Sequence, residues 1–107
     1  MNQATPEPGY PAGYRMTTMQ FPEEVSDEVL NRLRRAEGQL RGVQRLIEEG
    51  ADCKKVLTQL NAAQAALHRT GLRLMAAGMR YCLADPERAE SEGMTPDEME
   101  KLFLALR

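Results

Sequence analysis

Two cysteines, Cys53 and Cys82, carry the most distinctive chemistry in this sequence. A thiolate is both a nucleophile and a soft metal ligand. The two lie 29 residues apart in a proline-free segment whose apolar residues recur at three- and four-residue steps. On one continuous helix, this spacing puts them on one face, about 20° apart in azimuth and about 43 Å apart along the axis. They therefore cannot meet within one chain.

A second copy of this helix, packed antiparallel, would place each Cys53 beside Cys82 of the partner subunit. The two-fold axis would lie between Leu67 and His68, so that the arrangement repeats at both ends. The same face carries leucines and small residues that allow close helix approach: Leu60, Ala63, Leu67, Gly71, Leu74 and Gly78. The spacing predicts a dimer with two intersubunit dithiol sites. The alternative is that both thiols are small buried apolar groups on a packing stripe.

The two thiols are expected to differ in reactivity. Cys53 lies in the first helical turn, where free N–H groups lower the pKa of a thiol; Lys54 and Lys55 add to this effect and Asp52 opposes it. Cys82 lies near the C-terminal end, where the helix dipole disfavours a thiolate. Cys53 is therefore the predicted attacking sulfur and Cys82 the predicted resolving one.

Three further residues of the same predicted helix are of types that bind metals. His68, the only histidine, points away from the cysteine face and is predicted to lie on the surface. Met75 and Met79 lie near the cysteine face, but methionines at helical spacing are typical of core positions.

The arginines form a second set of candidate functional residues. Residues 27–84 carry ten basic and six acidic side chains, although the whole chain has a net charge of −2. Aligned basic clusters on two helices favour contact with DNA phosphates, whereas a single cluster is more typical of a solvated face. One predicted cluster is Arg34, Arg41 and Arg45, the other is Arg69, Arg73 and Arg80, and Arg32 and Arg35 flank the apolar stripe of the first helix.

Composition predicts an all-α fold, because helix formers dominate and aromatic residues make up only 5%. A first helix is expected at about 27–49, with Ser26 as N-cap and Gly50 as its stop. Its apolar stripe is Val29, Leu33, Ala36, Leu40, Val43 and Ile47.

A long second helix is expected from Cys53 to about residue 85, with Asp52 as its cap. It would be too long for a small domain to cover alone, which favours a partner subunit. Residues 86–94 are interpreted as an acidic loop, and Thr95 and Pro96 open a short third helix that ends at about 106.

The N-terminal region differs from the rest. Residues 1–25 hold four prolines and no apolar period, and are predicted to be a disordered or loosely docked tail before one domain over 26–107. No membrane span or secretory signal is visible, and two cysteines are too few for a disulfide scaffold. A cytoplasmic protein is expected.

The segment LNRLRRAEGQLRGV at 30–43, followed by Cys53, QAALHR at 64–69 and Cys82, resembles the CsoR/RcnR/FrmR family of bacterial transcriptional repressors. The resemblance covers about residues 27–106. It implies a three-helix protomer, an antiparallel dimer and a flat dimer-of-dimers, a homotetramer that binds double-stranded operator DNA without a helix-turn-helix. It also implies that the effector-free protein represses and that the effector releases DNA. The family's DNA-contacting arginines fall on Arg32 and Arg69.

One departure from the family pattern concerns the effector. Copper sensors of this family place Cys, His and Cys at positions matching 53, 78 and 82, but this chain has Gly78. Asp52 replaces an outer-shell tyrosine, and an outer-shell glutamate falls on Glu98 or on Lys101. The Cys–Gly–Cys pattern is more similar to the CsoR-like sulfurtransferase repressors, which sense persulfides without a metal.

The leading hypothesis is therefore a repressor whose Cys53/Cys82 pair senses persulfide or another thiol oxidant, with no cofactor required. The alternative is a Cu(I)-responsive repressor that uses the same two cysteines, since two thiolates suit that ion. The DNA-binding set predicted with either is Arg32, Arg34, Arg35, Arg41, Arg69 and Arg73. Two other classes are a dithiol enzyme, which would need a C-x-x-C motif or a nucleotide loop that the chain lacks, and a helical assembly module. We expect no enzymatic activity.

Overall fold

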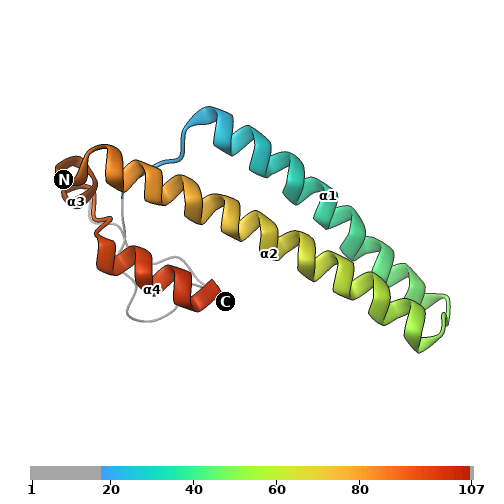
Figure 1. The fold of residues 1–107 in the computed structure, drawn as a ribbon. Coiled ribbons are helices and arrows are strands. Elements are labelled where there is room, and N and C mark those ends of the chain that lie inside the picture. Colours follow the sequence, from blue (N-terminus) through green and yellow to red (C-terminus); the bar gives the residue numbers. More distant parts are fainter. Residues whose placement is uncertain (1–17, 107) are drawn as a thin grey trace. The chain divides into compact units, whose positions relative to one another are not determined.

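The computed structural model describes residues 18–106, and every regular element within that range is a helix. Helix α1 spans Glu23–Glu48, α2 spans Cys53–Ala84, α3 spans Pro86–Ser91 and α4 spans Pro96–Leu106 (Figure 1). The predicted all-α class and the long central helix are thus confirmed. Two compact units make up the described chain, one of residues 22–74 and one of residues 18–21 with 75–106. The single domain expected over 26–107 stays a prediction.

In the unit of residues 22–74, α1 and the first part of α2 lie side by side (Figure 1). Four residues of α1 are buried, Val25, Val29, Ala36 and Val43, and the last three recur every seven positions, as do Ala63 and Thr70 of α2. This heptad spacing is typical of two helices packed along a common seam, and the small residues allow close approach. The other half of the predicted stripe is not covered: Leu33, Leu40 and Ile47 are 39%, 37% and 60% exposed.

The turn between α1 and α2 agrees with the prediction at Gly50 and Asp52. Gly50 has a φ of +74°, and its N–H donates to the carbonyl of Ile47, while Ala51 donates to Leu46. These two bonds form a Schellman motif, which needs a residue in the left-handed region and therefore favours glycine. Asp52 Oδ1 then accepts a hydrogen bond from the backbone N–H of Lys55 at 3.0 Å and caps α2.

The predicted start of the first helix was wrong by four residues. α1 begins at Glu23 directly after Pro22, whose carbonyl accepts the first helical hydrogen bond from Ser26 at 3.0 Å. Ser26 therefore lies inside the helix and caps nothing. Glu23 and Glu24 occupy the first turn, where the helix dipole favours acidic side chains. Residues 23–25 are thus helical and not part of a tail, while residues 1–17 of the predicted tail lie outside the described residues.

The second unit packs the last part of α2 with α3 and α4. The acidic segment expected to be a loop instead contains α3, because Asp85 caps it through the N–H of Arg88 at 3.1 Å and Pro86 occupies its first turn. The third predicted helix is confirmed as α4, with Thr95 Oγ1 accepting from the N–H of Glu98 at 3.2 Å. The protomer thus has one short helix more than the predicted three within residues 18–106.

Side chains of α2 and the α3 region also bond to one another in this unit. The Tyr81 hydroxyl donates to Glu92, and the Arg88 guanidinium lies 4.0 Å from the centre of the Tyr81 ring. The bond to Glu92, together with desolvation, raises the pKa of Tyr81. These contacts hold the end of α2, and with it Cys82, against the segment that leads into α4. No helix within residues 18–106 has the length and apolarity needed to cross a membrane.

Candidate effector and DNA-binding sites

Both cysteines lie on α2 as predicted, with Cys53 as its first residue and Cys82 two residues before its end. Both are free thiols, and they differ in environment: Cys53 is exposed, whereas Cys82 is half-buried. The capping bond of Asp52 to Lys55 means that a first-turn N–H is satisfied by a carboxylate and not by the thiol. The pairing of Cys53 with Cys82 of the partner subunit stays a prediction.

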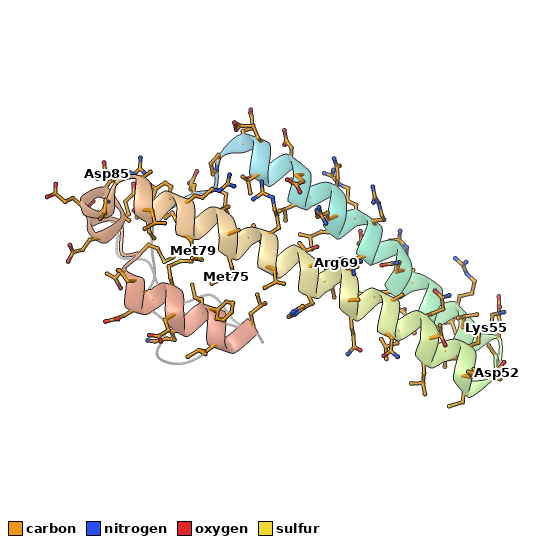
Figure 2. The ribbon with its side chains drawn as sticks, viewed as in Figure 1. Asp52, Lys55, Arg69, Met75, Met79 and Asp85 are labelled. Atoms are coloured by element: carbon orange, nitrogen blue, oxygen red, sulfur yellow. The ribbon has the colours of Figure 1, made fainter. Side chains whose placement is uncertain are left out.

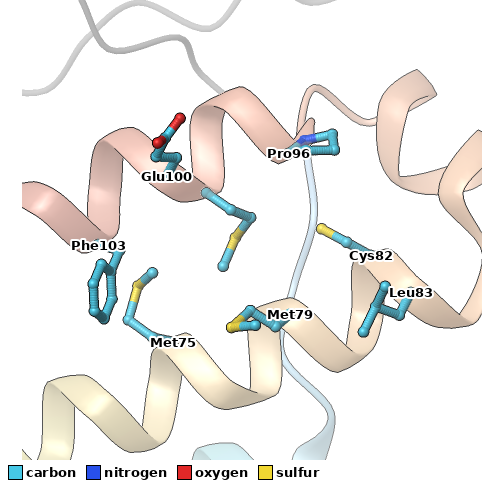
Figure 3. A pocket seen from close by; sticks show the side chains of 8 residues that line it. Met75, Met79, Cys82, Leu83, Pro96, Glu100 and Phe103 are labelled. Carbon is cyan, nitrogen blue, oxygen red and sulfur yellow. The ribbon is translucent and has the colours of Figure 1, made fainter.

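Cys82 lies at a cavity in the unit of residues 75–106. Its Sγ is 3.9 Å from the backbone carbonyl of Met94, and burial raises the pKa of the Cys82 thiol. The resolving role of Cys82 stays a prediction. We call the space beside it the sulfur cavity; it has a volume of about 280 Å³ (Figure 3). Its lining residues are Met75, Met79, Cys82, Leu83, Pro96, Met99, Glu100 and Phe103.

Gly78 stands at the position where, by the family resemblance, copper sensors carry a histidine. A Cβ on Gly78 would lie 3.1 Å from Cε and 3.3 Å from Sδ of Met99, so the methionine occupies the space of a side chain there. His68 is exposed, as predicted. Met75 and Met79 were predicted as core, but Met79 is 52% exposed and both line the sulfur cavity. The core prediction is therefore wrong for Met79.

Three of the predicted arginines come together in the unit of residues 22–74. Arg32 and Arg35 on α1 and Arg69 on α2 line one small cavity of about 120 Å³, which we call the arginine pocket (Figure 2 labels Arg69). Gln39, Ala66 and Thr70 complete its lining. The buried Oε1 of Gln39 has no hydrogen-bond partner within the described chain. The three guanidinium groups form a cationic surface suited to an anionic ligand, whereas the Gln39 oxygen can only accept a hydrogen bond.

Glu28 forms ion pairs with Arg32 of the arginine pocket and with a fourth arginine, Arg73. Its Oε2 lies 3.1 Å from Nη2 of Arg32, and its Oε1 lies 3.0 Å from Nε of Arg73. Desolvation raises the pKa of Glu28, but the hydrogen bonds and positive charges of Arg73 and Arg32 outweigh it and hold the pKa below the ordinary value of 4.5. One carboxylate thus binds two of the arginines that the sequence assigned to DNA.

Arg34 and Arg41 lie apart from the arginine pocket. Arg34 donates to Asn31 Oδ1 at 3.3 Å, and Arg41 lies 3.7 Å from Glu37 in an exposed pair. The azimuths predicted from sequence grouped these two on one face of α1. The structure gathers instead the arginines that flank the apolar stripe, because these point toward α2.

Sequence reasoning missed Glu28, Gln39 and Met99 as candidate functional residues. The spacing of Glu28 four residues before Arg32 was a visible signal for the ion pair. Nothing in the sequence places Arg73 or Gln39 at the same surface, since that depends on the register between α1 and α2. Glu98 and Lys101, the two candidates for the outer-shell position, pair with each other at 3.9 Å, and Glu98 is buried.

The ion pairs of Glu28 predict an acid-dependent loss of stability. Because the folded-state pKa lies below 4.5, folding favours the ionised carboxylate. Its stabilisation is therefore present above pH 4.5 and is lost as the pH falls from there through the folded-state pKa. We expect the Tm of the wild type to exceed that of Glu28→Gln at about pH 7, and the difference to shrink steadily as the pH is lowered below 4.5. Glu37→Gln, which breaks only an exposed pair, is the control; an equal effect in both variants would contradict the role of Glu28.

The sequence of this chain matches a known protein family. Residues 26–106 match the sequence model of the metal-sensitive transcriptional repressor family, and the chain belongs to that family. It is a family of transcriptional repressors and not of enzymes, in agreement with the expectation that the chain is not an enzyme.

Two curated relatives and one solved structure are similar to this chain. It is 41% identical over 59 residues to the copper-sensing transcriptional repressor CsoR of Bacillus subtilis (strain 168), a match covering 55% of this chain and 58% of that protein. It is 40% identical over 78 residues to the copper-sensing transcriptional repressor RicR of Mycobacterium tuberculosis (strain ATCC 25618 / H37Rv), covering 73% and 78%. The crystal structure of the copper-sensing repressor CsoR with Cu(I) from Geobacillus thermodenitrificans NG80-2 matches with a TM-score of 0.65 and 32% identity, over 85% of this chain and 92% of that one.

These findings confirm the family resemblance and leave its finer branch open. The relatives are named as copper-sensing, which favours the Cu(I) alternative over the persulfide hypothesis that led the sequence analysis. The persulfide-sensing branch is not confirmed.

Proposed function

We propose that this protein is a Cu(I)-responsive repressor that binds double-stranded operator DNA and releases it when Cu(I) binds between its cysteines. The observation that supports the effector is the sulfur cavity beside Cys82, whose lining offers thiol and thioether sulfur. DNA binding itself requires no cofactor in this proposal, and Cu(I) is a regulatory ligand.

The chemistry of the donor set fits Cu(I). Thiolates and thioethers are soft ligands that select this ion, whereas carboxylates and carbonyls suit harder ions. Within residues 18–106, no group of three or more His, Cys, Asp or Glu side chains is arranged to hold a metal. Cys53 and Cys82 of the partner subunit would supply the two thiolates. When bound, the ion would join two subunits that otherwise share no covalent link at this place.

The arginine pocket supports the DNA-binding half of the proposal. Arg32, Arg35 and Arg69 present guanidinium groups from two helices to one space, and guanidinium forks match phosphate oxygens in geometry. Glu28 competes with DNA for Arg32 and Arg73, because a phosphate and a carboxylate use the same donors. The repressing state therefore exchanges these ion pairs for phosphate contacts.

Assembly is the third part of the proposal. Apolar side chains remain exposed along α1 and α2 in the unit of residues 22–74: Leu33, Leu40, Ile47, Leu57 and Leu67. The seven-residue spacing of Leu33, Leu40 and Ile47 places them on one face of α1, and an exposed apolar face is typical of a subunit interface. We infer an antiparallel dimer, which also brings the cysteines together, and a homotetramer of two dimers. A stable monomer in light scattering at micromolar concentration would contradict both.

Persulfide sensing is a second candidate, favoured by the exposure of the Cys53 thiol to small reagents. Burial raises the pKa of the Cys82 thiol, so Cys53 is the more reactive of the two toward the first reagent. In this route, the Cys53 thiolate attacks the outer sulfur of a persulfide, becomes a persulfide itself and releases a thiol. Cys82 of the partner subunit, as thiolate, then attacks the Cys53 sulfur, forms a disulfide and releases hydrosulfide.

The two candidates are separated by one experiment on the wild-type protein. Operator DNA is followed by fluorescence anisotropy while Cu(I) or a low-molecular-weight persulfide is added anaerobically, and each sample is then analysed by intact mass spectrometry. We expect Cu(I) to release the DNA without a covalent mass change. Release by persulfide alone, with a disulfide-linked dimer in the mass spectrum, would overturn the Cu(I) proposal and support the second candidate.

A further inference from the structure

The sulfur cavity contains more potential copper ligands than the proposed function uses. Cys82 shares it with three methionines, Met75, Met79 and Met99, so four of its eight lining residues carry sulfur. No histidine lines it, and Glu100 is its only ionisable side chain besides Cys82. Figure 3 shows Met75, Met79 and Cys82 around the same space. Such a concentration of soft donors beside one thiol points to a ligand that prefers sulfur.

Met99 is the methionine of the cavity that comes from α4 and packs against Gly78 of α2. It lies in α4 and is 8% exposed, and its Sδ is 3.3 Å from where a Cβ on Gly78 would lie. Gly78 precedes Cys82 by four residues on α2, and residues at this spacing lie on one helix face. The thioether thus covers the turn of α2 directly before the thiol. Any larger residue at 78 would push it away.

Packing within one subunit leaves open space beside Met99. A methionine that only fills a core gap leaves little empty space beside it. Here a cavity of about 280 Å³ remains next to the Met99 and Cys82 side chains. Met79, on the same cavity, is 52% exposed in the single subunit.

We propose that the Met99 thioether is a third Cu(I) ligand, beside Cys82 and the partner subunit's Cys53, and that it reaches the ion across the space that Gly78 leaves free of a side chain. This inference rests on the proposed function, because it assigns a ligand to the same effector. A thioether is neutral and soft, so it adds a bond to the ion without adding charge to a site that already holds two thiolates. No electron transfer or covalent bond to carbon is involved.

Met99→Leu tests the assignment, with Met94→Leu as its matched control. Both methionines are 8% exposed, but the Met94 side chain does not line the cavity. Exchange of methionine for leucine conserves volume and is well tolerated in protein cores. Circular dichroism and light scattering verify that each variant keeps its helicity and assembly. We expect Met99→Leu to weaken Cu(I) binding by about tenfold or more, as loss of a metal-site partner does elsewhere, and Met94→Leu to leave it unchanged.

A spectroscopic measurement identifies the ligand directly. In protein produced with selenomethionine, X-ray absorption at the copper edge should show Cu–Se scattering, which should disappear in Met99→Leu and persist in Met94→Leu. Bound Cu(I) without any Cu–Se scattering would overturn this inference and leave the proposed function intact. Loss of Cu–Se scattering in Met79→Leu, with retention in Met99→Leu, would also overturn the assignment to Met99. Absence of Cu(I) binding by the wild type would overturn both.

Discussion

Operator DNA should stay bound to Cys53→Ser and to Cys82→Ser when Cu(I) is added, whereas the wild type releases it. Serine keeps the shape of cysteine but offers a hard oxygen in place of a soft thiolate. Coupling between an effector and a second ligand is typically about 1–3 kcal/mol, so we expect Cu(I) to weaken DNA binding by the wild type by about 5- to 150-fold. In either variant the change should be less than about twofold. Fluorescence anisotropy with a labelled operator measures both.

Two controls make this outcome specific to the thiols. DNA affinity without Cu(I) should be the same in the wild type and both variants, because neither cysteine lines the arginine pocket. Ala84→Ser adds a hydroxyl at an exposed position two residues after Cys82 and should respond to Cu(I) as the wild type does. Full release of DNA from Cys53→Ser would show that this thiol is not part of the effector site.

Local sequence signals predicted most helix ends, because those ends depend on residues within a few positions. Gly50 and Asp52 form the turn between α1 and α2, and Thr95 caps α4, as expected. Where prediction failed, two local signals competed. Ser26 is a good N-cap, but Pro22 already ends the extended segment and lets α1 begin at Glu23. Asp85 and Pro86 signal the start of a helix as clearly as Thr95 and Pro96 do. The acidic residues that follow led to the prediction of a loop instead.

The candidate sites were less predictable, since they depend on contacts between helices. Helical periodicity placed Cys53 and Cys82 on α2, and that prediction requires only one element. The arginine pocket requires the register of α1 against α2, which selects Arg32 and Arg35 over Arg34 and Arg41. The contact of Met99 with Gly78 requires the position of α4 on the last part of α2. A single sequence carries no direct signal for either register.

Replacing Arg69 with alanine should weaken operator binding strongly, and Arg32→Ala should do so as well. Each side chain lines the arginine pocket, and symmetry would repeat its phosphate contact in every subunit. Loss of a phosphate contact lowers the slope of log affinity against log salt by about one unit per contact. We therefore expect the difference from the wild type to be largest at low salt. Anisotropy titrations over a range of salt concentrations measure affinity and slope together.

Arg41→Ala is the matched control, because it removes the same charge from α1 outside the pocket. Arg41 lies in an exposed pair with Glu37, and its side chain is 65% exposed. If DNA were bound only through the total charge of the surface, replacing any one of the three arginines would reduce DNA affinity by the same amount. If DNA binds at the arginine pocket, Arg32→Ala and Arg69→Ala should reduce DNA affinity much more than Arg41→Ala does. Helicity and assembly should stay unchanged in all three variants. Equal losses in Arg32→Ala, Arg69→Ala and Arg41→Ala would therefore show that DNA does not bind at the arginine pocket.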